Sequence, residues 1–206
     1  SLTMVGVDGR TGVRVPLGGN ERRQVIKLDP SQPAALLLRE RRVVGPGDVR
    51  WQIVRMDAQG RRTLLREDPR WVHDVAVDVR GRIVALARFE GDHDALYRVL
   101  RNGALREVLR LRPMERIELL AVQADGSLLM VGNPGTAAGM GNVRRVMRLG
   151  ADDKLQTLHQ DPRGEADLDD VVIDPRTNQP LAASYRSTVA ATYGIGGAQD
   201  VVAAIV

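Results

Sequence analysis

The sequence repeats a short strand–turn–strand pattern, and this repeat constrains the fold more than any other feature. Three segments can be aligned: "WQIVRMDAQGRRTLLRED" from Trp51, "LYRVLRNGALREVLRL" from Leu96 and "VRRVMRLGADDKLQTLHQD" from Val143. In each, a short run of alternating apolar residues and arginines is followed by a polar turn and a second short run that ends in leucine. This pattern is typical of a β-hairpin, and it predicts three of them.

The segment 95–109 is the hardest test of this interpretation, because its leucines and valines also recur at helical spacing. Asn102-Gly103 lies in the middle of the segment. This dipeptide favours a two-residue type I′ turn, in which both residues have positive φ. Because the other two segments have a polar turn at the same place, we expect two strands joined by a turn at residues 101–103 here, not one helix.

A hairpin of a second type accompanies each of these, as in "VHDVAVDVRGRIVALARFEG" and "LDDVVIDPRTNQPLAASYR". The whole unit recurs at intervals of roughly 45 residues, and four short antiparallel strands at such a period indicate a β-propeller blade. We therefore predict an all-β fold with about four blades of four antiparallel strands. The predicted blades cover about 24–69, 70–112, 113–163 and 164–206, and a further hairpin at 4–17 precedes them.

A single blade cannot bury its apolar faces, so neighbouring blades must share a core. With 43% hydrophobic and only 3% aromatic residues, that core is expected to be aliphatic. The last unit ends in "STVAATYGIGGAQDVVAAIV", which offers no clear strand to complete a fourth blade. We expect either a fragment of a larger propeller or a homodimer that covers the apolar ends. Linear stacking into a solenoid, or a sandwich, is the alternative architecture.

Charge and composition exclude several classes of partner. The net charge is +4, but the 30 basic residues, all but two of them arginine, are dispersed among 26 acidic residues. This dispersion is typical of a solvated surface, so we predict no nucleic-acid partner. The apolar runs are too short to span a bilayer, and no signal peptide is recognisable, so we predict no membrane association. There is no cysteine, hence no disulfide and no thiolate metal site.

Histidine and acidic residues offer only weak candidates for a metal site. His93 lies between Asp92 and Asp94, but a polar loop explains this grouping better than a metal, and His73 and His159 are isolated. The acidic run "DPRGEADLDD" lacks the spacing of a calcium-binding loop. It reads as a solvated loop between blades that contains Asp161, Glu165, Asp167, Asp169 and Asp170. We predict no metal and no cofactor.

The glycine-rich segment Gly132–Asn142 lacks the Gly-Lys-Ser/Thr of a phosphate-binding loop, and we interpret it as a connection between two strands. Trp51, Trp71 and Tyr97 are predicted to pack between blades instead of facing a substrate. The serines show no Gly-x-Ser-x-Gly context, so no nucleophile is predicted; they are Ser1, Ser31, Ser127, Ser184 and Ser187.

The succession of these segments, from "RQVIKLDPSQPAALLLRERR" through "WVHDVAVDVRGRIVALARFEGDHDALYRVLRNGALREVL" to "DLDDVVIDPRTNQPLAASYR", resembles the N-terminal propeller of prolyl oligopeptidase family serine peptidases. The likeness is to bacterial acylaminoacyl and dipeptidyl peptidase-like members, and it covers roughly 23–186. In that family the propeller usually has seven or eight blades and lies over a C-terminal α/β-hydrolase domain that carries the catalytic serine, aspartate and histidine. The resemblance therefore implies that this chain is part of a propeller of seven or eight blades.

The resemblance implies that this chain is the substrate-gating part of a peptidase whose hydrolase domain is absent. Its partners would be that hydrolase domain and peptide substrates, in the periplasm or the cytoplasm. No catalytic residue of the family can be placed on this sequence, nor can the acidic pair that holds a substrate amino terminus in dipeptidyl members. We therefore expect no peptidase activity from this chain itself. A stand-alone propeller-like module that binds a protein or a small ligand is the alternative.

Overall fold

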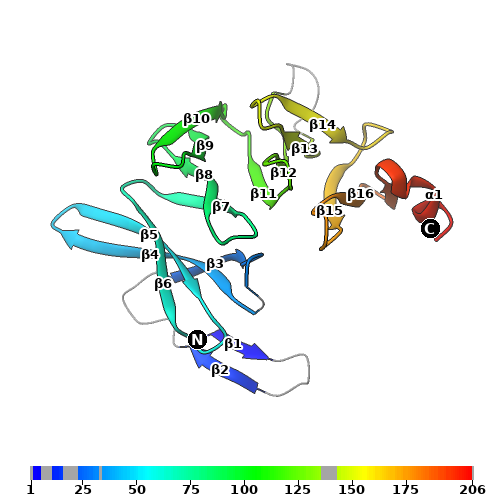
Figure 1. Cartoon of the computed structure of the whole chain (residues 1–206). Helices are drawn as coiled ribbons and strands as arrows, with labels where there is room; N and C mark the ends of the chain where they lie inside the picture. The colour runs from blue at the N-terminus through cyan, green and yellow to red at the C-terminus, as the bar shows by residue number, and fades with distance from the viewer. Residues whose placement is uncertain (1, 6–10, 16–22, 33, 136–142, 206) are drawn as a thin grey trace. The chain divides into compact units, whose positions relative to one another are not determined.

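The computed structural model describes residues 2–5, 11–15, 23–32, 34–135 and 143–205. The chain divides into two compact units, Ser1–Leu109 and Arg110–Val206. Strands make up nearly all of the regular structure in the described residues (Figure 1). The prediction of an all-β fold is therefore confirmed.

The first unit begins with a two-stranded hairpin and continues with two antiparallel four-stranded sheets, in each of which neighbours in sequence are neighbours in space. The hairpin consists of β1 (Leu2–Val5) and β2 (Thr11–Val15). The first sheet consists of β3 (Arg23–Leu28), β4 (Leu36–Gly45), β5 (Asp48–Met56) and β6 (Arg62–Asp68). The second consists of β7 (Val72–Val77), β8 (Ile83–Phe89), β9 (Asp94–Val99) and β10 (Leu105–Arg110).

The second unit contains one four-stranded and one three-stranded antiparallel sheet. The four-stranded sheet consists of β11 (Ile117–Val122), β12 (Leu128–Gly132), β13 (Arg145–Leu149) and β14 (Leu155–His159). The other consists of β15 (Asp167–Ile173), β16 (Pro180–Arg186) and β17 (Ala190–Gly194), and the 3-10 turn η1 (Gly196–Ala198) and the helix α1 (Gln199–Ala203) follow it.

A continuous apolar core lies between the two sheets of each unit. In the first unit it joins Leu37 and Ile53 of one sheet to Val75 and Leu86 of the other. In the second unit Leu129 and its neighbours on β12 and β13 pack against residues of β15 and β16. The inner strands β7 and β12 are buried at nearly every position, as expected where both faces of a sheet are covered, whereas the outer strands β6, β10 and β14 are largely exposed or half-buried. The shared aliphatic core is the packing expected of adjacent blades.

The segment 95–109 forms the β9–β10 hairpin, which resolves the choice between helix and strands. The turn is not of type I′, however. Gly103 has a φ of 82°, but Asn102 is not among the residues with positive φ. The Gly103 amide donates to the carbonyl of Leu100, and the Leu100 amide donates to Ala104. The loop therefore has three residues. It is a type I turn followed by a glycine in the left-handed region, in which only the last position needs positive φ.

The same loop closes several other hairpins. The amides of Gly60, Gly81 and Gly126 each bond to the carbonyl three residues earlier, and their φ angles are 78°, 78° and 81°. In the third sheet the equivalent position is held by Asp153, with a φ of 62°. The same turn conformation, with positive φ at its last residue, thus explains why glycine recurs in the sequence at regular intervals.

The last sheet departs from the predicted four-stranded pattern. Within the described residues it has three strands, and α1 follows β17, in agreement with the lack of a clear strand in the sequence to complete this unit. The chain bends sharply after Gly194, since a Cβ atom there would lie only 2.5 Å from the backbone of Ala198. Gly196 then takes a φ of 60°, and the alanine-rich segment that follows favours helix.

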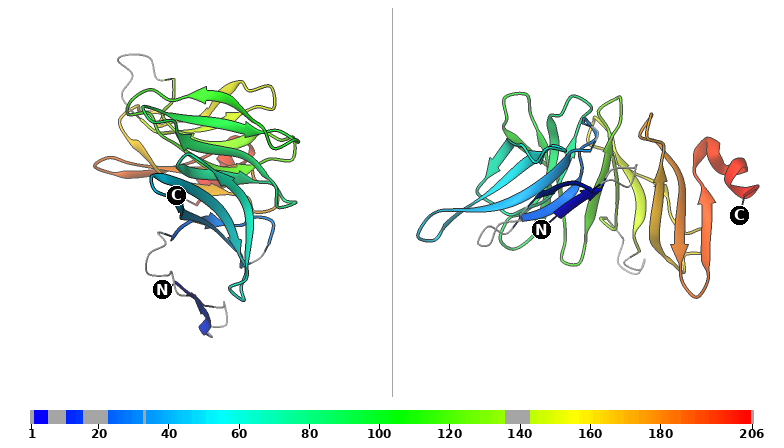
Figure 2. Two further views of the ribbon diagram at one scale, coloured as in Figure 1. Left: turned by 90° about the vertical axis from the view of Figure 1, so that its left-hand side faces the viewer. Right: turned by 90° about the horizontal axis from the view of Figure 1, so that it is seen from below.

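The β4–β5 hairpin is longer than the rest of its sheet. β4 pairs with β3 only as far as Glu40, and β5 pairs with β6 only from Trp51 onward. The remaining two-stranded arm, residues 41–50, projects past its neighbours and ends in the turn Pro46-Gly47 (Figure 2).

Candidate binding site

An open hollow of about 940 Å³ lies in the first unit between the first and second sheets. It is formed by β6, by the turns that join β7 to β8 and β9 to β10, and by the strand ends beside those turns (Figure 1). We call it the arginine hollow, because four of its lining residues are arginines and none is acidic. Its lining residues are Leu65, Arg66, Arg80, Gly81, Arg82, Ile83, Val84, Val99, Leu100, Arg101 and Gly103.

The β7–β8 turn is held rigidly by the side chain of Asp78. Its Oδ1 accepts hydrogen bonds from the backbone amides of Arg80 and Arg82, at 3.0 and 2.9 Å. Its Oδ2 accepts from the Arg82 guanidinium at 2.9 and 2.7 Å. Partial burial acts to raise the pKa of Asp78, but the hydrogen bonds from Arg82 and Arg80 hold that pKa below its ordinary value. The carboxylate is thus committed to the turn.

The four arginines of the hollow differ in whether they have a carboxylate partner. Arg66 donates to the carbonyl oxygen of Gly103 at 3.2 Å and lies 3.6 Å from Asp68, while Arg82 is paired with Asp78. Arg80 and Arg101 are exposed, and within the described part of the chain no carboxylate lies within ion-pair distance of either guanidinium. The hollow therefore carries uncompensated positive charge at its rim.

Arginines also connect the two sheets of the first unit elsewhere, which contradicts the expectation that they form only a solvated surface. Arg39 of β4 is 8% exposed and donates to the carbonyl of Val72 at 2.8 Å. Its guanidinium lies 4.8 Å from the ring centroid of Trp71 and 5.8 Å from that of Trp51. Burial lowers the pKa of Arg39 from its usual value. These contacts place both tryptophans in packing between sheets.

Tyr97 occupies a comparable place in the second sheet. It is part of the apolar core, and the Arg88 guanidinium lies 4.4 Å from its ring centroid. Its hydroxyl donates to Glu107 at 3.1 Å, and burial raises the pKa of Tyr97 to about 12. Burial by itself lowers the pKa of Arg88, but hydrogen bonding to Glu90 and the charge of Asp68 raise it overall.

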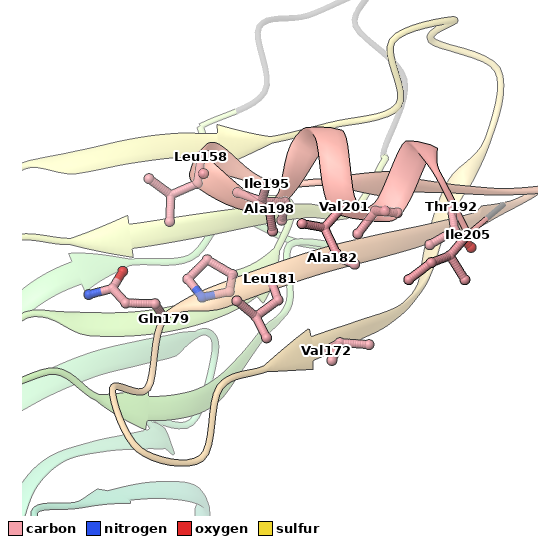
Figure 3. Close-up of a pocket in the computed structure, with 14 residues that line it drawn as sticks. Leu158, Val172, Gln179, Leu181, Ala182, Thr192, Ile195, Ala198, Val201 and Ile205 are labelled. Atoms are coloured by element: carbon pink, nitrogen blue, oxygen red, sulfur yellow. The ribbon is translucent and has the colours of Figure 1, made fainter.

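The second unit contains an apolar groove of about 850 Å³, between the last sheet and α1 (Figure 3). Leu158, Leu181 and Ile195 contribute to its walls, and Val201 and Ile205 line the side formed by the C-terminal residues. Gln179 and Thr192 are its only polar side chains. It is suited to an apolar surface but carries no charged group.

The serines that the sequence analysis considered have structural partners. Ser31 donates to Asp29 at 2.6 Å, Ser127 donates to Gln123 at 2.7 Å, and Ser184 bonds to Thr192 at 2.9 Å. Ser1 lies outside the described residues, and Ser187 is exposed beside β16.

The three histidines lie in separate places. His93 Nδ1 lies 2.5 Å from a carboxylate oxygen of Asp92 and forms a hydrogen bond with it. The ring of His73 stacks on that of Trp71, with 5.6 Å between the ring centroids. His159 Nδ1 bonds to the hydroxyl of Tyr185 at 2.7 Å. No group of three or more potential metal ligands occurs among the described residues.

The acidic run 161–170 does not converge on one point. Asp161 accepts backbone amides of its own loop, at 2.9 Å from both Glu165 and Ala166. Asp167 accepts the Arg144 amide at 2.6 Å, and Asp169 pairs with Arg186 at 2.8 Å. The carboxylates of this run therefore organise loops and strand ends separately.

The glycine-rich segment joins β12 to β13, as the sequence predicted, but residues 136–142 lie outside the described residues. No helix in the described part of the chain has the length and apolarity needed to cross a membrane.

No protein-family model matches this chain, and no curated protein matches it. Among solved structures, TolB from Acinetobacter baumannii is similar with a TM-score of 0.59 and 10% sequence identity. The alignment covers 94% of this chain and 46% of the TolB chain, so this chain spans about half the length of that protein. A catalytically inactive virginiamycin B lyase from Staphylococcus aureus, with quinupristin, has a TM-score of 0.36 and 12% identity over 89% of this chain and 83% of its own.

The likeness to TolB, which is a propeller, agrees with the sheets described above. The four sheets of this chain are β-propeller blades. These comparisons do not confirm the resemblance to the propeller of prolyl oligopeptidases.

Proposed function

We propose that this chain is a noncatalytic propeller segment that binds polypeptides. The observation that carries the proposal is the arginine hollow. There Arg80 and Arg101, which have no carboxylate partner among the described residues, lie beside apolar side chains at two turns of the second sheet. Arginine next to exposed apolar surface is characteristic of protein recognition sites. A concave site at blade turns lets a partner reach these groups without disturbing the core.

The hydrogen bonds of the serines support a noncatalytic role. A catalytic serine needs a general base within hydrogen-bond reach, and a third group that orients the base. The hydroxyls of Ser31 and Ser127 instead bond to side chains of their own turns. The hydroxyl of Ser184 bonds across two strands of one sheet. These three serines make local hydrogen bonds within turns or strands, which supports the noncatalytic role.

Within this function, the gating propeller of a prolyl oligopeptidase-like peptidase is the more specific proposal. The succession of motifs between residues 23 and 186 supports it. The test is the reading frame that encodes the protein. Further blades followed by Gly-x-Ser-x-Gly, with a downstream aspartate and histidine, would establish it. A reading frame without these motifs would leave the stand-alone binding module.

The experiment for the general proposal combines two measurements on the purified chain. In the first, peptide and aminoacyl substrates are incubated with the chain, and we expect no hydrolysis. In the second, the chain is applied to an array of immobilised peptides of varied composition, and we expect a reproducible subset to bind. Hydrolysis that disappears when Ser187 is replaced by alanine would contradict the noncatalytic role, and an array without any bound peptide would contradict the binding role.

A further inference from the structure

We propose that the arginine hollow recognises acidic segments of a polypeptide in which glutamate or aspartate alternates with an apolar residue. This inference rests on the proposed function and names the chemistry of its partner. It is argued from the charges that remain unpaired in the hollow, from the apolar side chains beside them and from the hydrogen bonds already made by the turns.

The charge of the hollow selects an anion. Of its four arginines, Arg66 and Arg82 have carboxylate neighbours in Asp68 and Asp78, and both carboxylates lie outside the lining. The remaining two, Arg80 and Arg101, are separated in sequence but lie on adjacent turns of one sheet. A guanidinium forms paired hydrogen bonds with a carboxylate, so these two positions suit two acidic side chains.

The backbone of the hollow strengthens this preference. The carbonyl oxygen of Gly81 accepts a hydrogen bond from Arg55 at 3.1 Å, and that of Gly103 accepts one from Arg66 at 3.2 Å. One carbonyl oxygen in each turn therefore already accepts a hydrogen bond from an arginine of the first sheet, whereas Arg80 and Arg101 have no carboxylate partner among the described residues. A ligand in the hollow meets donors, which again favours an acceptor such as a carboxylate.

The apolar part of the lining selects against a bare anion. Leu65 and Val99 are half-buried, and Leu100 is exposed beside the two rim arginines. An inorganic ion cannot use this surface. In an extended peptide, alternate side chains point to opposite sides, so a leucine or valine between two acidic residues can cover apolar surface while its neighbours bind arginine.

Nucleic acid fits these features less well. Proteins that hold single strands use aromatic side chains on which bases stack, and no aromatic residue lines the hollow. Binding to a duplex uses cationic residues spread along a surface, whereas these four arginines surround one concavity. A peptide is therefore the partner that matches both charge and shape.

The test measures binding of fluorescein-labelled peptides to the whole chain by fluorescence anisotropy at fixed ionic strength. The probe alternates leucine and glutamate, and the two comparison peptides carry glutamine or lysine in place of glutamate. We expect only the glutamate peptide to bind well. Arg80→Glu and Arg101→Glu should each weaken its binding roughly five- to tenfold, since each replaces an attraction at an exposed site by a repulsion.

Arg176→Glu is the matched control. Arg176 occupies the same place in the β15–β16 turn as Arg80 in its turn, and its amide likewise donates to the first aspartate of the turn, Asp174, at 2.9 Å. The Arg176→Glu substitution changes the net charge as much as Arg80→Glu does, but Arg176 lies outside the hollow. Circular dichroism checks that all three variants keep the sheet structure.

Equal loss of affinity in Arg176→Glu would overturn the proposal, because the effect would then be one of net charge. Equal binding of the glutamine peptide would also overturn it, as would tighter binding of an oligothymidine strand that depends on Arg80. If no glutamate peptide binds although the peptide array is positive, the hollow is not the site but the binding function stands. A negative array removes the function itself.

Discussion

The guanidinium of Arg55, on β5, donates a hydrogen bond of 3.1 Å to the backbone carbonyl of Gly81 in the turn of the neighbouring sheet. The same side chain is paired with Asp29 and bonds to Ser31, so it connects turns of two blades. Burial acts to raise the pKa of Asp29, but the hydrogen bonds from Ser31 and Arg55 lower it overall. One arginine therefore sets the spacing between two turns.

Gly81→Ala is expected to lower the free energy of unfolding by more than backbone strain alone would. A Cβ atom at this position would lie 2.6 Å from Nη2 of Arg55, and the φ of 78° is already unfavourable for alanine. The strain costs about 1–2 kcal/mol. Displacement of Arg55 adds about 1 kcal/mol, the value of a typical hydrogen bond. The measurement is the free energy of unfolding in urea.

Gly126→Ala is the control for this substitution, because Gly126 has a φ of 81° but open space around its Cβ position. Gly126→Ala should lower the free energy of unfolding by the cost of the backbone strain, without the additional loss that comes from displacing Arg55. If the two variants lose the same stability, the contact between Arg55 and Gly81 contributes nothing.

Arg39→Ala is expected to lower the free energy of unfolding by about 2–4 kcal/mol. The substitution removes a buried guanidinium that lies near two tryptophan rings, and it leaves the carbonyl of Val72 without this donor. Tryptophan fluorescence in a urea titration measures the effect, because Trp51 and Trp71 are the only two tryptophans. Arg42→Ala, at an exposed position with an ion pair of 3.8 Å, should change stability by less than about 0.5 kcal/mol. Similar losses in both variants would show that burial of Arg39 is unimportant.

Stability is expected to fall as pH decreases below about 6.5, in part because of His159. Burial lowers the pKa of His159, and the carboxylate of Asp161 opposes this only partly. The unfolded chain therefore takes up a proton at a pH where the folded chain does not. The stabilisation is complete above the unfolded value and is lost as pH falls through the folded value.

His159→Gln removes this titration but retains a polar side chain that can reach the Tyr185 hydroxyl. The urea midpoint of the variant should change less between about pH 7.5 and pH 5.5 than that of the unsubstituted chain. An NMR titration of the His159 ring in the folded chain provides the direct measurement. A ring that titrates at or above 6.5 would contradict this expectation.

We expect the self-association that the sequence predicted from uncovered apolar surface to involve the apolar groove. Val201 and Ile205, at its edge, are 61% and 79% exposed. Exposed apolar clusters of this kind commonly mark association sites. We expect light scattering to detect a dimer, and the combined substitution Val201→Glu and Ile205→Glu to give a monomer. Val189→Glu, equally exposed but outside the groove, should remain dimeric. A monomeric parent chain would end this prediction.

The hairpins could be predicted from the sequence because each turn needs a glycine or a short polar residue at one fixed position. Gly60, Gly81, Gly103 and Gly126 all have φ near 80°, and the strands between them are too short and too interrupted to form helices. The type of turn at Asn102 could not be predicted, because Asn-Gly is compatible with two loop lengths that differ by one residue.

The arginine hollow was not visible in the sequence for a physical reason. Arg66, Arg80 and Arg101 belong to three different loops or strands, and only the stacking of two blades brings them together. Arg39 and Arg55 look identical to surface arginines in composition, but their strands place them between sheets. A hint was present in the pairs Asp57/Arg61 and Asp78/Arg82, which repeat at the same spacing and form the same turn.

The arm formed by residues 41–50 has a practical consequence for anyone who wishes to label this protein. Among the described residues its tip pairs only with itself, and none of their atoms lies within 4 Å of the Cβ position of Gly47. A fluorescent tag or an epitope inserted between Pro46 and Gly47 would lengthen an exposed hairpin turn without disturbing the packed part of the blade. The arm thus provides a permissive insertion point.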